Sequence, residues 1–576
     1  MATSTETPSE TDTGAKRRFR PYQIALVIGG GFAAITAASY VAEQLWAEHW
    51  AETYAEEQPI SRLMFNNIPG WLRLSFYVLV VGAILYGAFN FSNRVRNWER
   101  GGPDDRRTKP KNVKKRLENM RSGLYMQTLL RDPAAGVMHS FIYFSFLVLL
   151  AITTIGEINL QLPVALKFLH GDVYRAYAFI ADLAGVFFVV GLIWAVVRRY
   201  VQKPYRIRIK TKADHAIGLG VLLAIGVTGF IAEGFRIALE GMPEGDNLAF
   251  IGYPLAHALK GMGGLEWWHR TWWIVHILSF IAFLVVLPTT MLRHMFTSPI
   301  NMYLKDRDRP KGAMKAMPNL METELETFGA SVVEDFTWKQ LLDTDACTMC
   351  GRCTSVCPAS GTGKPLDPRE IVLKTGEVMA ATGDPQVSPP IALDGEITIG
   401  ANSLFERITP EEVWACTSCK ACDEICPVNI EILDKILDMR RYLTLMESNF
   451  PTELGSAYQG MENQGNPWAM PQSDRAKWAD KVDGIKILEG GDPLEAEYLY
   501  WVGCAGSFDD KNQKVTQAVA KLLQRAEVSF AILGPSEQCT GDPARRSGNE
   551  YIFQMLAMQN IETLDSMGVK KIIAQC

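Results

Sequence analysis

Apolar and polar positions divide this chain into two halves of different character. Within the first three hundred of its 576 residues, six apolar stretches are each close to the roughly 20 residues that a helix needs to cross a bilayer. They cover about 22–43, 71–92, 136–157, 174–197, 214–235 and 271–293. Beyond residue 300 the pattern is that of a soluble protein. It therefore predicts a multidomain fold in which an α-helical membrane bundle of about six spans precedes soluble domains.

Positive residues flank these stretches on alternate sides. Basic runs precede the first stretch and follow the second (94–115) and the fourth (198–212), whereas the intervening loops are acidic or neutral. Since Lys and Arg collect on the cytoplasmic side of a lipid bilayer, the C-terminal half is predicted to be cytoplasmic. The net charge of −5 gives no indication of a nucleic-acid partner. The N-terminal residues 1–21 are expected to be disordered.

Cysteines dominate the soluble half. Eight of the eleven fall into two copies of one pattern, C-x2-C-x2-C-x3-C-P. The pattern is typical of a two-cluster ferredoxin, in which three thiolates hold one cubane [4Fe-4S] cluster and the fourth reaches the other cluster. It assigns one cluster to Cys347, Cys350, Cys353 and Cys426, and the other to Cys416, Cys419, Cys422 and Cys357.

Zinc is the alternative metal for these thiols. Zinc ribbons also use C-x2-C pairs, but they need neither the third cysteine nor the trailing proline. A reducing cytoplasmic location favours metal ligation over disulfides. The chain contains no glycine-rich dinucleotide fingerprint and no P-loop. The spacing thus indicates an iron–sulfur protein that transfers electrons.

Histidines at membrane depth are candidates for a second kind of redox centre, because hydrocarbon offers them no hydrogen-bond partner. His276 and His294 are 18 residues apart. On one continuous helix this spacing equals about five turns and roughly 27 Å, so the two imidazoles would share one face near opposite membrane surfaces. The spacing predicts axial ligands of b haems, one or two in number, stacked across the bilayer.

Each haem needs a second ligand at the same depth. His139, near the cytoplasmic end of the third stretch, is predicted to pair with His294. His170, at the outer start of the fourth stretch, is predicted to pair with His276. His269 competes with His276, but it is assigned to an aromatic belt at the outer interface, beside four tryptophans.

The C-terminal segment alternates strand-like and helix-like runs. Strands are expected at 498–503, 528–533 and 571–574, and helices at about 512–525 and 549–567, as in a small α/β unit. Cys504, Cys539 and Cys576 follow the strand ends, where sites of such sheets gather. They are candidate ligands of a further iron–sulfur cluster, and three buried structural cysteines are the alternative. Residues 361–410 are expected to be largely loop with short helices.

Two resemblances extend this interpretation. Residues 135–296 look like the gamma subunit of respiratory nitrate reductase, a dihaem cytochrome b, through Met138-His139-Ser140, His276 and Leu292-Arg293-His294; where that family has its second histidine in the third span, this chain has Leu149. The C-terminal unit resembles the cysteine-rich CCG domain of heterodisulfide reductases, with Cys539-Thr540 in place of a Cys-Cys pair. The family pattern continues beyond Cys576, so the sequence is expected to be a fragment.

The whole chain resembles prokaryotic membrane-bound iron–sulfur oxidoreductases that fuse a gamma-type cytochrome to a heterodisulfide-reductase-D-like half. The resemblance implies a multi-pass enzyme of the plasma membrane that passes electrons from electron-transfer flavoprotein, or another cytoplasmic flavoprotein, to quinone. Two alternatives stay open, a heterodisulfide-type thiol/disulfide reductase and a non-catalytic relay subunit of a larger respiratory complex. Thr540 counts against the reductase.

These observations predict six segments along the chain. They are a disordered N-terminus (1–21), a two-span anchor with a basic cytoplasmic linker (22–134), a dihaem cytochrome b-like membrane domain (135–300), a mainly α-helical two-[4Fe-4S] ferredoxin-like domain (301–440), a connector (441–494) and a truncated CCG-type domain (495–576).

Overall fold

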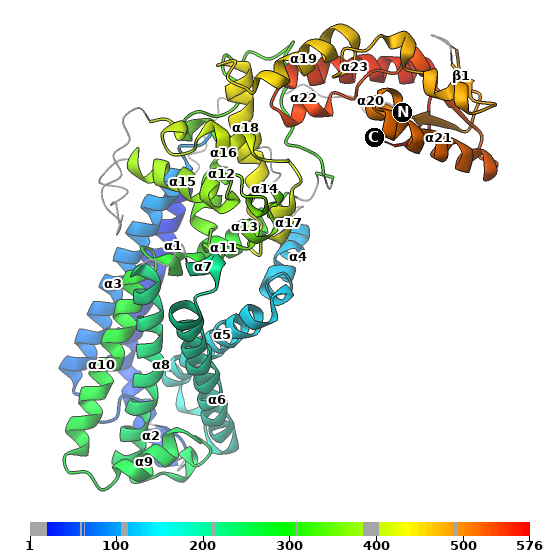
Figure 1. Cartoon of the computed structure of the whole chain (residues 1–576). Helices are drawn as coiled ribbons and strands as arrows, with labels where there is room; N and C mark the ends of the chain where they lie inside the picture. The colour runs from blue at the N-terminus through cyan, green and yellow to red at the C-terminus, as the bar shows by residue number, and fades with distance from the viewer. Residues whose placement is uncertain are drawn as a thin grey trace.

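The computed structural model consists of a helical bundle, a helical middle domain and a small α/β unit (Figure 1). It describes residues 20–57, 60–62, 64–104, 113–208, 213–306, 309–310, 312–383, 402–488 and 492–575. The segment expected to be disordered lies, up to residue 19, outside the described residues, as does Cys576. The three-part arrangement confirms the predicted fold class.

Six helices of the described chain are long and apolar enough to cross a membrane, which confirms the predicted number. They are α1 (Pro21–Ala42, continued to Ala47), α3 (Gly70–Trp98), α5 (Pro133–Gln161), α6 (Gly171–Val196, continued to Gln202), α8 (Ala213–Leu239) and α10 (Leu265–Val286). α1 packs against α3, α5 against α6, and α8 against α10. Shorter helices connect them: α2 (Glu48–Glu57), α4 (Val113–Leu124), α7 (Tyr205–Arg208) and α9 (Gly252–Leu259).

The sixth spanning helix ends earlier than the apolar stretch does. α10 stops at Val286, and a 3₁₀ turn leads into α11 (His294–Tyr303). Pro288 accounts for the break, because it lacks the N–H that would continue the helical ladder. Arg94 Nε donates to the Pro288 carbonyl oxygen at 2.7 Å and fixes the turn. The prediction that His276 and His294 share one continuous helix is therefore wrong.

The middle domain is mainly α-helical, as predicted. It contains α12 (Trp338–Ala346), α13 (Arg352–Val356), α14 (Pro358–Gly361), α15 (Pro368–Ala381), α16 (Pro410–Trp414), α17 (Ala421–Ile425) and α18 (Ile432–Leu445). Residues 361–410 were expected to be largely loop with short helices, and the described part of this range contains the helix α15. Asp367 caps this helix by accepting from Arg369 N at 2.9 Å, and Ile371, Val372 and Val378 bury its apolar face. Residues 384–401 lie outside the described part.

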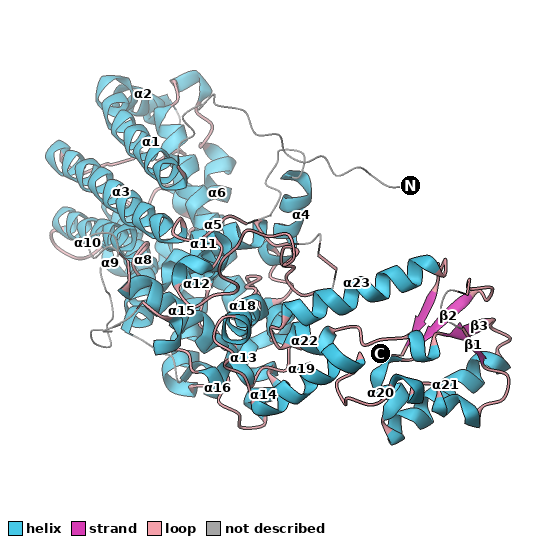
Figure 2. Cartoon of the chain, turned by 90° about the horizontal axis from the view of Figure 1, so that it is seen from above, coloured by secondary structure: helices cyan, strands magenta, loops and turns pink. Residues whose placement is uncertain are grey.

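The α/β unit contains a parallel sheet, visible at the end of the molecule away from the bundle (Figure 2). Its strand order is β1 (Lys486–Ile487), β3 (Phe530–Ile532), β2 (Tyr498–Trp501) and β4 (Ile572–Ala574). The helices are α19 (Thr452–Gln464), α20 (Gly503–Phe508), α21 (Asp510–Arg525), α22 (Asp542–Arg546) and α23 (Glu550–Ser566). The three predicted strands are confirmed. β1 lies in the predicted connector, and its two exposed residues carry no strand pattern.

The α/β unit docks on α18 of the middle domain. Arg440 Nη1 donates to the Arg546 carbonyl oxygen at 2.7 Å, and Thr444 Oγ1 donates to that of Ser547 at 3.0 Å. Gly548 makes this approach feasible, because its φ is +89° and an added Cβ would lie 2.5 Å from the Arg440 carbonyl carbon. The junction therefore depends on a residue without a side chain.

Replacing Gly548 with Ala should destabilise the junction by about 2–4 kcal/mol, because it combines left-handed backbone strain with a steric clash. Thermal unfolding and the rate of limited proteolysis between the two domains measure the effect. Gly568→Ala is the matched control, since its φ is +67° and nothing lies within 4 Å of an added Cβ. It should cost only the backbone strain of about 1–2 kcal/mol. Equal losses in the two variants would contradict the proposed close contact.

Candidate redox centres

Two hollows in the middle domain are lined by the eight ferredoxin-type cysteines. The first is lined by Cys347, Cys350, Cys353 and Cys426, and the second by Cys357, Cys416, Cys419 and Cys422. The crossing arises from α13 and α17, which pack against each other. The residue that ends each helix, Cys357 or Cys426, thereby lines the hollow of the other repeat. This is the grouping that the sequence pattern assigns.

Both repeats turn sharply at equivalent positions. Met349 and Gly351 in the first repeat, and Ser418 and Lys420 in the second, all have positive φ between 54° and 68°. The turns direct backbone N–H groups towards sulfur, and Ser418 N lies 3.4 Å from Cys416 Sγ. Successive N–H groups in such turns form concave sites for negative charge, which suits a thiolate-bound cluster.

The thiols are shielded from water. Burial raises the pKa of Cys347 and of Cys426 to about 12, and it also raises the pKa of Cys353 and Cys422. Iron would therefore have to displace protons on binding, as thiolate-ligated metals do. In the described residues no three His, Cys, Asp or Glu side chains converge as they would around a single metal ion. The two hollows are each lined by four cysteine thiols, which are the ligands that a cubane cluster takes.

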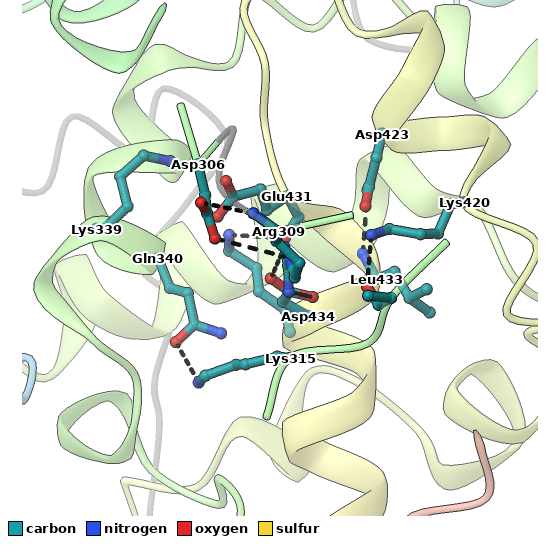
Figure 3. A network of polar contacts seen from close by, with 12 residues as sticks. Asp306, Arg309, Lys315, Lys339, Gln340, Lys420, Asp423, Glu431, Leu433 and Asp434 are labelled. Carbon is teal, nitrogen blue, oxygen red and sulfur yellow. Dashed lines mark hydrogen bonds and ion pairs between the residues drawn. The ribbon is translucent and has the colours of Figure 1, made fainter. Parts of the chain in front are cut away.

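A polar network, drawn in Figure 3, lies beside the second hollow, whose lining includes Lys420 and Leu433. Arg309 Nη2 pairs with Asp434 Oδ2 at 2.7 Å, and Lys420 Nζ donates to the Ala313 carbonyl oxygen at 2.9 Å. These contacts hold the buried Met314 against α18 and Cys416. The network thus keeps an apolar wall beside the second set of cysteines.

His139 and His294 lie together at the end of the bundle that faces the middle domain. Their ring centroids are 6.4 Å apart and the ring planes are inclined by 62°. Two imidazoles on opposite sides of one metal ion place their centroids roughly 6 Å apart, given metal–nitrogen bonds of about 2.0 Å. His294 Nδ1 donates to the Met291 carbonyl oxygen at 2.6 Å, which leaves Nε2 free. His139 Nδ1 is buried without a partner. The pair fits the axial ligands of one b haem.

His276 has a different environment. It lies in the middle of α10, and its Nδ1 is 3.1 Å from Thr228 Oγ1 on α8. Gly229 lets the ring approach α8 closely, because an added Cβ would lie 3.4 Å from His276 Cε1. The ring contacts found for the described residues bring no second imidazole to His276.

His170 is not brought to His276. It precedes α6 at the outer end of the bundle, is exposed, and makes a T-shaped contact with Tyr54 at a centroid distance of 6.1 Å. His269 lies near the outer end of α10, where it is buried beside Asn67. Leu149 packs in an apolar cluster with Phe188 and other side chains of α6, α8 and α10.

Asp345 connects the first hollow to the histidine pair. Its Oδ1 accepts from Arg94 Nη1 at 2.9 Å and lies 3.0 Å from Arg293 Nε, and its Oδ2 accepts from Trp98 Nε1 at 2.8 Å. Burial alone would raise the pKa of Asp345, but the two guanidinium groups and Trp98 outweigh it and hold that pKa below its usual range. Asp345 stands two residues before Cys347, and Arg293 directly precedes His294. One carboxylate therefore joins the segment that carries Cys347 to the segment that carries His294.

Two buried arginines add a second link between the first hollow and the bundle. Arg352 Nη1 and Nη2 donate to the carbonyl oxygens of Thr128 and Leu129 at 2.8 and 2.7 Å, just before α5 begins. Arg369 Nη1 donates to the Arg206 carbonyl oxygen at 2.6 Å. Since α5 carries His139, the first hollow is the one that faces the histidine pair.

The second hollow faces the α/β unit instead. Arg546 Nη1 donates to the carbonyl oxygen of Ser418, which stands between Cys416 and Cys419, at 2.9 Å. Arg440 Nη2 donates to the Cys416 carbonyl oxygen at 2.5 Å. Arg546 ends α22, the helix that follows Cys539. The contacts thus lead from the α/β cysteines to the second hollow.

Cys504 and Cys539 are buried side by side after β2 and β3. Their hydrogen bond and their burial raise the pKa of Cys504. Arg475 Nη2 donates to Cys504 Sγ at 3.3 Å and pairs with Glu537 Oε1 at 3.2 Å. Arg475 belongs to the predicted connector, so sequence spacing gave no sign of its role. The third candidate, Cys576, follows β4 but lies outside the described residues.

Comparisons with known proteins agree with this architecture. Residues 346–431 match the 4Fe-4S dicluster domain family, and residues 498–576 match the cysteine-rich domain family (CCG). Together with six spanning helices, these matches define a membrane-anchored iron–sulfur oxidoreductase. No solved structure matches the chain.

Three curated relatives indicate which kind of iron–sulfur oxidoreductase this chain resembles. The probable iron-sulfur-binding oxidoreductase FadF of Bacillus subtilis is 34% identical over 485 residues, which cover 77% of this chain and 67% of FadF. The EtfAB:quinone oxidoreductase of Syntrophomonas wolfei is 35% identical over 476 residues, which cover 78% and 66%. One polypeptide of the dihydromethanophenazine:CoB–CoM heterodisulfide reductase of Methanosarcina barkeri is 28% identical over 250 residues, which cover 42% and 57%.

The chain belongs to the family of membrane-bound iron–sulfur oxidoreductases that includes FadF, which confirms the resemblance seen in its sequence. It spans about two thirds of the length of the first two relatives. These relatives are named as oxidoreductases, and the chain is accordingly an iron–sulfur oxidoreductase.

The crossed grouping of cysteines predicts which substitutions act together. Cys350→Ser and Cys426→Ser should alter the same paramagnetic signal of the reduced protein, because both residues line the first hollow. Cys357→Ser should alter the other signal, together with Cys419→Ser. Paramagnetic resonance of dithionite-reduced membranes distinguishes the two groups. An uncrossed site would instead place Cys357 with Cys350.

Replacing Asp345 with Asn should loosen the bundle from the middle domain by about 3 kcal/mol, because it leaves two partly buried guanidinium groups without their carboxylate. The thermal midpoint should fall, and a haem held by His139 and His294 would be reduced more slowly by the cluster domain in stopped-flow measurements. The control is Glu334→Gln, which breaks the more exposed Arg100 pair of the same interface and should cost about 0–1 kcal/mol. If both variants behave alike, Asp345 does not carry the junction.

Proposed function

We propose that this oxidoreductase transfers electrons from a cytoplasmic flavoprotein, in the first place electron-transfer flavoprotein, to membrane quinone. The observation that carries the proposal is a series of contacts and short chain segments that links the unit of Cys539 to the second hollow, the second hollow to the first, and the first to His294. Bound [4Fe-4S] clusters and a b haem would supply one-electron carriers between two partners that each exchange electron pairs.

The residues of this chain give the series its order. Arg546 and Arg440 hold the α/β unit against the loop that carries Cys416 and Cys419. Asp345 and Arg352 hold the opposite side of the cluster domain against the membrane bundle. A soluble donor therefore meets the α/β unit first, and the membrane acceptor lies at the other end.

The side of the membrane follows from charge. Arg94, Arg198 and Arg206 belong to the basic runs at the ends of α3 and α6, and they lie at the end of the bundle next to the cluster domain. By the positive-inside rule this side is cytoplasmic. The cluster and α/β domains then share the compartment of soluble flavoproteins, in a multi-pass protein of the plasma membrane.

The identities of donor and acceptor rest on similarity. A relative that is 35% identical is named for electron-transfer flavoprotein and quinone. A thiol/disulfide reductase is the second candidate, favoured by the hydrogen-bonded thiols of Cys504 and Cys539 and by the heterodisulfide reductase relative. Thr540 stands beside Cys539 where that chemistry is associated with a second cysteine, which favours quinone as the acceptor.

Quinone reduction by reduced electron-transfer flavoprotein tests the proposal. The purified chain in detergent should bleach a water-soluble quinone, and Cys422→Ser should abolish the reaction, because it removes a ligand from the middle of the series. Lys477→Ala, at an exposed pair with Asp474, serves as the control and should leave the rate unchanged. Turnover of a disulfide substrate without quinone reduction would replace the proposal with the second candidate.

A further inference from the structure

We infer that the membrane bundle holds a single b haem, between His139 and His294, and that quinone is reduced in the half of the membrane next to the cluster domain. Electrons then do not cross the bilayer. The reaction itself rests on the proposed function, whereas the number and place of the haem rest on the imidazoles of the bundle.

The distribution of imidazoles is the first argument. All eight histidines fall within the described residues. Among the described residues, a ring contact between two histidines is found between His139 and His294. Both axial positions of one haem are thus provided at the cluster side of the bundle. The prediction of two stacked haems needs a second pair, and the described structure brings none together.

His276 has a structural role instead. Its hydrogen bond to Thr228 joins α10 to α8, and Gly229 lets the two helices approach. Such interhelical hydrogen bonds beside small residues are a common way to join helices in a membrane. The contact of its Nδ1 with Thr228 leaves Nε2 free, as in His294, but no second imidazole faces His276 in the described chain, so it lacks the partner of a bis-histidine site.

The space near the middle of the bundle is filled by apolar side chains. Leu149, at the position where the resembling cytochrome has its second histidine, packs with Phe188, Leu192 and Phe283. The break at Pro288 also removes the continuous helix that would align His276 with His294. Among the described residues, neither a ligand nor the predicted spacing for an outer haem is present.

Two buried ionisable contacts in the half of the bundle away from the cluster domain hold loops. Arg236 Nη2 pairs with Asp246 Oδ1 at 2.9 Å and ties the end of α8 to the following turn. Asp182 Oδ2 accepts from Ile251 N at 2.7 Å and from Gly252 N at 3.2 Å, at the start of α9. These side chains are occupied by backbone and ion-pair contacts.

The chemistry follows from this one-sided placement. Quinone gains two electrons and two protons to become quinol, while the reduced flavoprotein loses two electrons. The electrons arrive at His139 and His294 from the cluster side, and the hydrocarbon beyond them is about 30 Å thick in all. A haem held by His139 and His294 would supply single electrons in the near half of the membrane, and quinone reduced there would take its two protons from the aqueous phase on the cluster side. No net charge moves across the membrane.

Haem content gives the first test, independent of turnover. The pyridine haemochrome of the purified chain should give one haem per polypeptide. His139→Leu and His294→Leu should each lose it, whereas His276→Gln, which keeps a hydrogen-bonding group for Thr228, should retain it in full. Two haems per chain, or loss of haem on His276→Gln, would overturn the inference.

Charge movement gives the second test. Proteoliposomes with quinone in the lipid should reduce it with externally added reduced flavoprotein, and a voltage-sensitive dye should stay constant during turnover. A potential that grows with turnover would overturn the one-sided placement. Failure to reduce quinone at all would overturn the proposed function and the placement, while the haem count would still decide the number of haems.

Discussion

The crossing of the fourth cysteine of each repeat is the constraint on which the structure depends. Cys357 and Cys426 each end a short helix, and the packing of α13 on α17 sends each one to the hollow of the other repeat. Neither hollow has four thiols without both repeats, so the two centres form together or not at all. Their separation is then fixed by covalent chain rather than by weak contacts.

Each hollow has its own neighbour because different charged residues surround it. The first is attached to the bundle by Asp345 and Arg352, and the second to the α/β unit by Arg440 and Arg546. Guanidinium groups suit both junctions, because one side chain can donate to two backbone carbonyl oxygens at once. The two cysteine repeats are alike, but their neighbours differ: one hollow faces the bundle and the other faces the α/β unit. Electron transfer between two unlike partners requires such a difference.

Local spacing predicted much of this arrangement. The cysteine grouping follows from intervals along the chain, and the strands at Tyr498, Phe530 and Ile572 follow from apolar runs. Long-range contacts escaped prediction. Arg475 reaches Cys504 from a segment without any motif, and β1 has two exposed residues that only its partner strand β3 orders. The end of α10 was missed for another reason, since Pro288 lies inside an apolar stretch and hydropathy alone does not register a missing N–H.

The single haem inferred on the cluster side would change the energetics of the reaction. Across a membrane that is negative inside, each electron moving outward through 100 mV would contribute about 2.3 kcal/mol to driving quinone reduction. An outer haem would let an enzyme of this architecture draw on that contribution, at the expense of the membrane potential. Because Leu149 lies in the apolar core and no second imidazole faces His276, the described part of this chain has no ligand pair for an outer haem. On the proposed one-sided placement, the difference in potential between flavoprotein and quinone would drive the reaction alone, and turnover would leave the membrane potential intact.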